Sequence, residues 1–205
     1  MTRLGIAINT RRCIGCQTCA LSCKMQNGVP EGMLWNRVIT EGADVLDGAV
    51  GTYPHLSRTY LPIACQHCEN PACMRVCPTG ATYKDALGRV EVDYEKCIGC
   101  RMCMAACPYN ARVFNWNDPT YNPDFKFGDK DVPMRSKGVV EKCTLCKERT
   151  DRGIEPMCVQ NCPYEARIFG DLDDPDSEVS RIVRERNATV LLEEQGTRPQ
   201  VHYFN

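Results

Sequence analysis

Sixteen of the 205 residues are cysteines, and they fall into four groups of four with none left over. The first and third groups are spaced C-x2-C-x2-C-x3-C, the second C-x2-C-x4-C-x3-C and the fourth C-x2-C-x11-C-x3-C. The groups are Cys13, Cys16, Cys19 and Cys23; Cys65, Cys68, Cys73 and Cys77; Cys97, Cys100, Cys103 and Cys107; and Cys143, Cys146, Cys158 and Cys162. This internal repeat organises the chain, so any fold must be built around it.

The repeat extends beyond the cysteines. The pattern Cys-Pro-x-x-Ala begins at Cys77, Cys107 and Cys162, and only the first group lacks the proline. The last two copies run on in parallel, as Arg-Val-Phe from Arg112 and as Arg-Ile-Phe from Arg167. Each unit is therefore predicted to contain a short strand, a ligand loop, at least one helical turn and a second short strand.

Three chemistries can use such thiols. Disulfides fit the even number of cysteines, but no secretion signal is visible, and four cysteines within one short loop suit metal chelation better. Structural zinc usually takes two C-x2-C pairs separated by a spacer, a pattern that the fourth group alone resembles. An iron–sulfur cube takes three thiolates from one tight loop, and the fourth cysteine of the loop ligates the other cluster of a pair. The spacing therefore favours four-iron clusters, and sixteen cysteines at four per cube predict four of them.

The remaining composition excludes several classes of protein. A formal net charge of −1 without a basic patch does not favour binding to nucleic acid. The apolar runs, such as residues 4–8, are too short for a direct membrane span. Arg11-Arg12 leads directly into Cys13 rather than into an apolar stretch, so we expect no twin-arginine export signal there. No GxGxxG, P-loop or Ser/His/Asp arrangement is present, so no catalytic residues are expected.

The order of the cysteine motifs resembles one protein family. Cys-Ile-Gly-Cys is followed by Cys-Gln-His-Cys-Glu-Asn-Pro-Ala-Cys, by Cys-Ile-Gly-Cys again, and by Cys-Thr-Leu-Cys with a delayed third cysteine. This order is similar to that of the four-cluster electron-transfer subunits of complex iron–sulfur molybdoenzymes, such as the dimethyl sulfoxide, polysulfide, thiosulfate, tetrathionate and arsenate reductases. The resemblance runs from about residue 4 to the C-terminus, and residues 170–175 and 196–201 look nearest to the arsenate and polysulfide branch.

The resemblance implies four crossed ligand sets for [4Fe–4S] clusters. Set 1, nearest the molybdenum subunit, is Cys13, Cys16, Cys19 and Cys162, and set 2 is Cys143, Cys146, Cys158 and Cys23. Set 3 is Cys65, Cys68, Cys73 and Cys107, and set 4, on the quinone side, is Cys97, Cys100, Cys103 and Cys77. Nitrate reductase relatives have Trp at one of these positions and a three-iron cluster. Here that position is Cys100, so four complete cubes are expected.

The expected fold class is α+β, with two ferredoxin-like lobes of the bacterial 2×[4Fe–4S] type nested in the sequence. Residues 1–60 and 138–170 form discontinuous lobe A, and residues 61–115 form lobe B. Residues 116–137 are expected to be an insertion loop, and residues 171–205 a C-terminal docking extension outside both lobes. Within this extension, the aromatic pair Tyr203-Phe204 is expected to anchor a partner.

A chain of clusters moves single electrons, so the predicted function is electron transfer. The resemblance implies a large catalytic subunit that holds the molybdopterin and a quinone-reactive membrane anchor, in an anaerobic respiratory reductase. The chain would then lie peripherally at the cytoplasmic membrane through its partners, on the outer face after co-export, with the cytoplasm as the other possibility. Two other readings stay open: the iron–sulfur subunit of a soluble molybdoenzyme, of hydroxyl-transfer or dehydrogenase type, and a free polyferredoxin.

Several other side chains near the cysteines are candidates for a functional role. His67 lies between two cysteines of the second group, where a hydrogen bond beside the cluster is favoured over iron ligation. Trp35 and Trp116 are expected in core or interface packing rather than between redox centres. Four cations within or beside the ligand loops either raise cluster potentials or are solvated surface charges, and these are Lys24, Arg75, Arg101 and Lys147.

Overall fold

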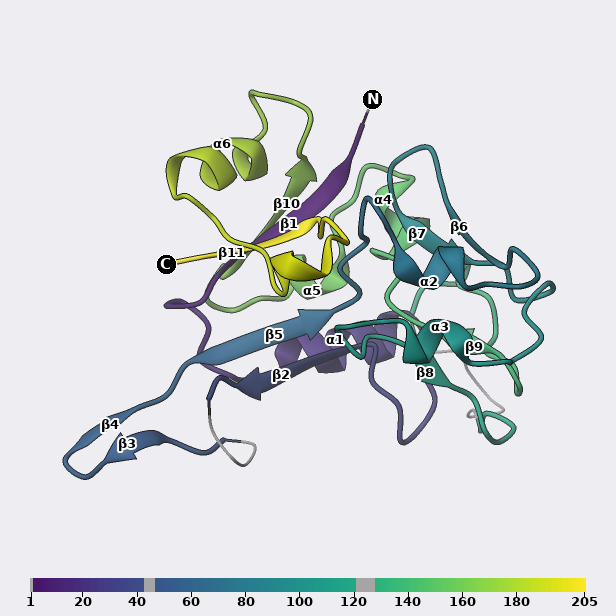
Figure 1. The fold of residues 1–205 in the computed structure, drawn as a ribbon, viewed down its shortest axis with the longest axis horizontal. Coiled ribbons are helices and arrows are strands. Elements are labelled where there is room, and N and C mark those ends of the chain that lie inside the picture. The colour runs from purple at the N-terminus through teal and green to yellow at the C-terminus, as the bar shows by residue number, and fades with distance from the viewer. Residues whose placement is uncertain (1, 43–46, 121–127) are drawn as a thin grey trace.

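The computed structural model describes residues 2–42, 47–120 and 128–205. It has the expected α+β character, with short helices and several small sheets (Figure 1). The strands are β1 (Leu4–Asn9), β2 (Asn36–Thr40), β3 (Val50–Thr52), β4 (His55–Ser57), β5 (Tyr60–Ala64), β6 (Thr82–Lys84), β7 (Val90–Val92), β8 (Val113–Phe114), β9 (Val140–Glu141), β10 (Arg167–Asp171) and β11 (Val201–Phe204). The helices are α1 (Thr18–Gln26), α2 (Ala72–Arg75), α3 (Met102–Ala105), α4 (Lys147–Thr150), α5 (Met157–Gln160), α6 (Glu178–Glu185) and the 3-10 turn η1 (Glu193–Gln195).

The largest sheet has the strand order β10-β1-β11. Strand β1 is antiparallel to β10 and parallel to β11, with Ile6 opposite both Phe169 and Val201. Since β1 is the central strand and is covered on both faces, nearly all of its residues are apolar and buried. Ala7 packs with Val179 of α6 on one face, whereas Leu4, Ile6 and Ile8 pack on the other face, in a core that includes cysteines.

The C-terminal strand corrects one expectation from the sequence. Tyr203 and Phe204 are buried in the chain's own sheet, with exposed fractions of 5% and 9%. The Tyr203 hydroxyl also donates a hydrogen bond to the carbonyl of Pro62, at 2.8 Å. Pairing with β1 makes β11 part of the chain's own sheet and not of an extension outside both lobes. The expectation that Tyr203 and Phe204 anchor a partner is therefore wrong, because these two side chains are already covered.

Each cysteine group has the predicted local order of elements. Strands β1, β5, β7 and β9 lead into the four groups, and a helix follows or contains the third cysteine of each. Strands β2, β6, β8 and β10 come after the groups. The predicted unit of strand, ligand loop, helical turn and strand is confirmed in all four copies.

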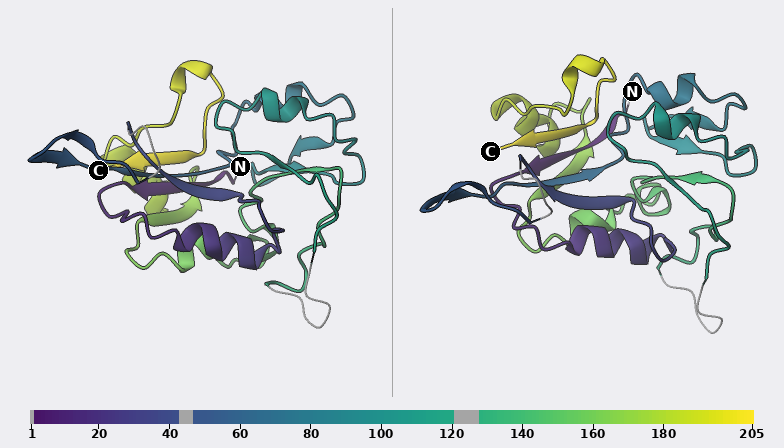
Figure 2. Two further views of the ribbon diagram at one scale, coloured as in Figure 1. Left: turned by 90° about the horizontal axis from the view of Figure 1, so that it is seen from below. Right: turned by 60° about the horizontal axis from the view of Figure 1, so that its bottom comes forward.

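The cysteine groups are distributed over two sides of the molecule. Figures 1 and 2 show α2, α3, β6 and β7, from the second and third groups, on one side, and the β10-β1-β11 sheet with α6 on the other. Helix α1 lies against α5 and against β2, which pairs with β5. The β3–β4 hairpin projects away from this body (Figure 1).

The expected insertion loop contains no helix or strand in its described parts, residues 116–120 and 128–137. Its remaining residues, 121–127, lie outside the described residues. In the three described stretches of the chain, no helix has the length and the apolar character that a bilayer crossing requires.

Candidate metal centres

All sixteen cysteines are described, and none of them forms a disulfide. In every group the third cysteine lies in a short helix and the fourth at or just beyond a helical turn. Cys19 and Cys23 share α1, whereas Cys103 lies in α3 and Cys107 follows it. The helical turn therefore separates the fourth thiol from the loop that carries the first two, as a crossed arrangement requires.

The ligand loops depend on left-handed backbone conformations. Gly15 and Gly99, in the two Cys-Ile-Gly-Cys motifs, have φ values of 72° and 69°. A Cβ atom at Gly99 would lie 2.3 Å from the carbonyl oxygen of Gly138, so a side chain there would collide with backbone. The residues after the second cysteine, Gln17 and Arg101, are also left-handed, with φ values of 60° and 61°. These turns fold each loop back on itself and gather its thiols.

The structure brings together cysteines of sets 1 and 2. Burial raises the pKa of Cys13, and the thiols of Cys19 and Cys162 add to this effect. Cys16 contacts Thr18 Oγ1, so its membership of set 1 rests on the loop that it shares with Cys13. In set 2, burial raises the pKa of Cys23 well above its ordinary value, and three further thiols raise it more, those of Cys143, Cys146 and Cys158.

Cysteines of sets 3 and 4 also lie together. Burial raises the pKa of Cys68 to about 12, and the three thiols that contribute to this rise are those of Cys65, Cys73 and Cys107. For set 4, one small cavity is lined by all four of the expected ligands, Cys77, Cys97, Cys100 and Cys103. The thiols that gather in space thus come from different groups of the sequence, as crossed ligation predicts.

The thiols of set 2 lie in a strongly apolar environment. All four are buried, and burial raises the pKa of Cys143 and brings that of Cys146 to about 12. Such thiols are neutral at ordinary pH unless a metal stabilises the thiolate. Among the described residues no three His, Cys, Asp or Glu side chains stand close enough to hold a single ion. A [4Fe–4S] cluster instead takes cysteines that stand further apart, one at each iron corner. The four cysteines around the set 4 cavity and the four buried cysteines of set 2 therefore fit [4Fe–4S] groups.

Backbone amides approach several sulfurs. The amides of Thr82, Leu145 and Ala166 donate to the sulfurs of Cys77, Cys143 and Cys162 at 3.4, 3.4 and 3.3 Å. Although burial acts in the opposite direction, hydrogen bonds from Thr82 and Thr79 lower the pKa of Cys77. Amide donors of this kind stabilise thiolate charge and tune the potential of an iron–sulfur group.

Two buried arginines donate to sulfur, and sequence reasoning did not single them out as site residues. Arg112 Nη2 lies 3.0 Å from the Cys73 sulfur, and Arg167 Nη1 lies 3.8 Å from the Cys158 sulfur. Their exposed fractions are 3% and 6%. The signal that could have found them is the repeat itself, because each arginine directly follows a Cys-Pro-x-x-Ala motif.

The four loop cations singled out in the sequence point elsewhere. Lys24 Nζ donates to the carbonyl of Met33, and Lys147 pairs with Asp151 at 3.1 Å. Arg75 is exposed and donates to Asn70 Oδ1. The exposed Arg101 lies over the Trp116 ring, 4.5 Å from its centroid. These contacts favour the interpretation of the four cations as local structural or surface charges.

His67 and Trp35 have structural positions beside the cysteines. His67 is fully buried, and its Nδ1 accepts a hydrogen bond from the backbone amide of Val90, at 3.1 Å. Burial, together with the charges of Lys142 and other cations, lowers the pKa of His67 well below its ordinary value, so the ring is neutral. Trp35 is buried in a core with Cys23, Cys65 and other cysteines, which confirms core packing, whereas Trp116 is 61% exposed.

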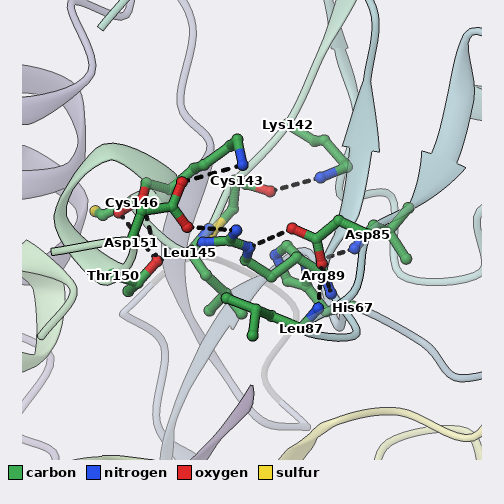
Figure 3. Close-up of polar contacts among 12 residues, drawn as sticks. His67, Asp85, Leu87, Arg89, Lys142, Cys143, Leu145, Cys146, Thr150 and Asp151 are labelled. Atoms are coloured by element: carbon green, nitrogen blue, oxygen red, sulfur yellow. Dashed lines mark hydrogen bonds and ion pairs between the residues drawn. The ribbon is translucent and has the colours of Figure 1, made fainter. Parts of the chain in front are cut away.

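A buried ion network joins the segment between the second and third cysteine groups to the fourth group. Figure 3 shows the Arg89 guanidinium between the carboxylates of Asp85 and Asp151. Arg89 Nε lies 2.7 Å from Asp85 Oδ2, Nη1 lies 2.7 Å from Thr150 Oγ1, and Nη2 lies 2.6 Å from Asp151 Oδ1. Thr150 Oγ1 in turn donates to the carbonyl of Cys146. The network holds the fourth group in place against the second and third.

Comparison with known proteins identifies 4Fe-4S domains in the chain. A family described as the 4Fe-4S dicluster domain matches residues 56–122 and 130–172, which is more than half of the chain. A second 4Fe-4S dicluster domain family matches residues 96–150, and a 4Fe-4S binding domain family matches residues 10–26. These three matches touch every one of the four cysteine groups, and the cofactors of the chain are accordingly 4Fe-4S clusters.

Relatives of the whole chain agree with these family matches. A protein of Halobacterium salinarum, named for the iron–sulfur subunit of a dimethyl sulfoxide reductase, is 54% identical over 100% of this chain and 80% of its own length. The arsenate respiratory reductase iron–sulfur subunit of a Shewanella species is 38% identical, over 98% of this chain and 96% of its own. The iron–sulfur cluster-binding subunit of menaquinone reductase from Nitratidesulfovibrio vulgaris is 36% identical, over 98% and 88%. With these cysteine groups and these relatives, the chain belongs to the family of iron–sulfur electron-transfer subunits of respiratory oxidoreductases such as the dimethyl sulfoxide and arsenate reductases.

Proposed function

We propose that this chain holds four [4Fe–4S] clusters in two nested ferredoxin-like lobes and relays electrons between a molybdopterin catalytic subunit and a quinone-reactive membrane anchor. Residues 1–60 with 138–170 form lobe A, which holds sets 1 and 2, and residues 61–115 form lobe B, which holds sets 3 and 4. When bound, the clusters supply one-electron transfer. The chain's own residues hold, separate and shield them.

The observation that carries this proposal is that neighbouring thiols connect the four proposed sets in a row. In three pairs, the two thiols lie near enough for the charge of one to raise the pKa of the other. Cys19 and Cys158 join set 1 to set 2, Cys65 and Cys143 join set 2 to set 3, and Cys73 and Cys103 join set 3 to set 4. All four cysteines of set 2 are buried, whereas sets 1 and 4 each contain one exposed cysteine, Cys16 and Cys100. An ordered row with a buried middle and exposed ends suits a relay between two partners.

The two ends of the row also carry exposed apolar side chains. Ile14 and Leu21, beside set 1, are 47% and 58% exposed, and Ile98 and Met102, beside set 4, are 66% and 53% exposed. Exposed apolar groups gathered around a redox centre favour a protein interface there. Following the family resemblance, the set 1 end faces the molybdopterin subunit and the set 4 end faces the quinone side.

The relatives support the choice of partners. The arsenate reductase subunit belongs by name to a respiratory reductase, and the Nitratidesulfovibrio relative is named for a menaquinone reductase. A chain with such partners lies peripherally at the cytoplasmic membrane, and export of the assembled complex through a signal on a partner places it on the outer face.

Metal analysis tests the cofactor part of the proposal. The complex, purified without oxygen, is expected to contain sixteen irons and sixteen acid-labile sulfides attributable to this chain, since four complete ligand sets are present. Zinc at four per chain with little iron would refute the proposal.

Co-purification of the tagged chain tests the partners. The proposal expects a large molybdopterin subunit and a membrane subunit. A large subunit alone would instead indicate a soluble molybdoenzyme, and the absence of both would indicate a free polyferredoxin.

Two variants test which end of the chain meets which partner. Ile98→Glu is expected to weaken association with the membrane subunit only, and Ile14→Glu with the large subunit only, both at unchanged iron content. The matched control is Leu56→Glu, which alters an exposed residue of the β3–β4 hairpin, where the hairpin projects from the body (Figure 1).

A further inference from the structure

Two buried arginines occupy equivalent positions in the repeat. Each follows a Cys-Pro-x-x-Ala motif and begins or precedes a short strand, Arg112 before β8 and Arg167 at the start of β10. Each directs one nitrogen at a cysteine sulfur and the other at a neutral oxygen. For Arg112 the oxygen is Thr82 Oγ1 at 3.2 Å, and for Arg167 it is Asn36 Oδ1 at 3.2 Å.

A charged guanidinium inside a protein requires a compensating anion. In residues 2–42, 47–120 and 128–205, neither Arg112 nor Arg167 forms an ion pair with a carboxylate. The side-chain hydrogen bonds of each arginine go to one cysteine sulfur and one neutral oxygen. Arginine keeps its positive charge in proteins, so each of these sulfurs faces a cation. The two cations are therefore fixed charges whose counterions are the proposed cluster ligands.

Each guanidinium lies between two ligand sets. Arg112 donates to Cys73 of set 3, and it also lines the cavity whose lining includes the four cysteines of set 4. Arg167 donates to Cys158 of set 2, and the sulfurs of Cys19 and Cys162 from set 1 also act on its charge. The sulfurs nearest to each arginine include the third cysteines of two different groups, so the two sites repeat the same arrangement in the two proposed lobes.

We propose that Arg112 and Arg167 set the reduction potentials of the clusters in pairs, Arg112 those of sets 3 and 4 and Arg167 those of sets 1 and 2. This inference rests on the proposed four-cluster function. An electron that enters a lobe from one partner and leaves to the other adds one negative charge beside the guanidinium, without any proton or bond change. A fixed positive charge in contact with the ligand sulfurs stabilises that added charge and raises the potential of both clusters beside it.

The test is potentiometric titration of the purified complex, followed by electron paramagnetic resonance of the individual clusters. Arg112→Gln is expected to lower the equilibrium constant for reduction at least tenfold in two clusters, which corresponds to about 59 mV for one electron. These are the two clusters whose signals are altered by Cys73→Ser and by Cys103→Ser. Arg167→Gln is expected to shift the other two and to leave this pair unchanged.

Two further variants separate charge from structure. Arg75→Gln is the matched control, because it removes the same charge two residues after Cys73, but from an exposed side chain that is bonded to Asn70. It is expected to shift no potential by as much as tenfold in the equilibrium constant. Arg112→Lys keeps a cation in the same place and is expected to recover most of the shift seen in Arg112→Gln.

The outcomes separate this inference from the proposed function. A parent complex that lacks sixteen irons refutes the proposed function itself. A parent with sixteen irons, in which Arg112→Gln keeps all its iron and leaves the potentials unmoved or shifts all four equally, overturns the inference alone. If Arg112→Gln loses iron, the lysine variant decides: full iron with potentials near the parent supports a role of charge, and loss of iron there too overturns it.

Discussion

The Arg89 guanidinium is paired with the Asp151 carboxylate at 2.6 Å, across 62 residues of sequence. Arg89 precedes β7, in the segment between the second and third cysteine groups, and Asp151 follows α4 within the fourth group (Figure 3). The side chain of Arg89 is 2% exposed, and Asp85 pairs with it from the other side. This side chain therefore links the two proposed lobes.

We expect Arg89→Met to destabilise the folded protein by about 3 kcal/mol, because it leaves the Asp85 carboxylate without its buried partner. The loss should appear as a lower thermal midpoint and as faster release of iron. Asp151→Asn is expected to cost less, since Asp151 is partly exposed and Arg89 retains Asp85. Lys96→Met, which breaks an exposed pair with Asp93, is the control and should leave the thermal midpoint almost unchanged, because solvent screens such a pair. Equal effects of Arg89→Met and Lys96→Met would show that the buried network does not join the lobes.

Serine variants of single cysteines test the crossed ligand sets. Cys100→Ser and Cys77→Ser are expected to alter the same paramagnetic signal, because both residues line one cavity although they belong to different groups. Cys107→Ser is expected to alter instead the signal that Cys68→Ser alters. If Cys100→Ser and Cys107→Ser altered the same signal, each cluster would be held by one contiguous group and the crossed sets would be wrong.

Glu91 predicts a pH dependence of stability. Burial raises the pKa of this carboxyl to about 7, although Lys142 and Arg89 act in the opposite direction. A folded-state pKa above the unfolded value means that the folded state holds the proton more tightly, so stability falls as the pH rises from about 4.5 to about 7. Glu91→Gln removes this loss, and we expect the variant to be more stable than the parent by up to about 3 kcal/mol at pH 8 but not at pH 4.5. Thermal midpoints of the two proteins across this range measure the difference, and parallel curves would contradict the assignment.

The sequence was sufficient for the parts of the structure that follow from local spacing. The cysteine groups and the strand–loop–helix unit depend on local spacing, which the repeat displays directly. The glycines of the two Cys-Ile-Gly-Cys motifs likewise have the left-handed conformation that such a tight ligand loop requires.

The sequence was less informative where contacts join distant segments. Strand β11 is a run of only four residues, and its parallel partner β1 lies at the opposite end of the chain, so its alternation could not indicate which surface would cover it. Arg112 and Arg167 were missed for a different reason. Arginine is almost never fully buried, and only the folded chain brings the sulfurs of Cys73 and Cys158 beside Arg112 and Arg167.

The burial of Tyr203 predicts the effect of shortening the C-terminus. Tyr203→Ala is expected to destabilise the protein by about 3 to 5 kcal/mol, since a buried aromatic ring is lost together with the hydrogen bond to the Pro62 carbonyl. Tyr203→Phe removes only that hydrogen bond and is expected to cost about 1 kcal/mol. At roughly 2 to 4 °C per kcal/mol for a domain of this size, the alanine variant should unfold well below the parent. Tyr53→Ala, at a tyrosine that is 85% exposed in the β3–β4 turn, is the matched control and should leave the midpoint unchanged.

Deletion of residues 201–205 should go further and lower the iron content, because β1 loses its parallel partner and leads directly into the first ligand loop. A deletion variant with full iron content and the parent's thermal midpoint would show that β11 contributes nothing to the lobe and would restore the view of the tail as a separate docking element.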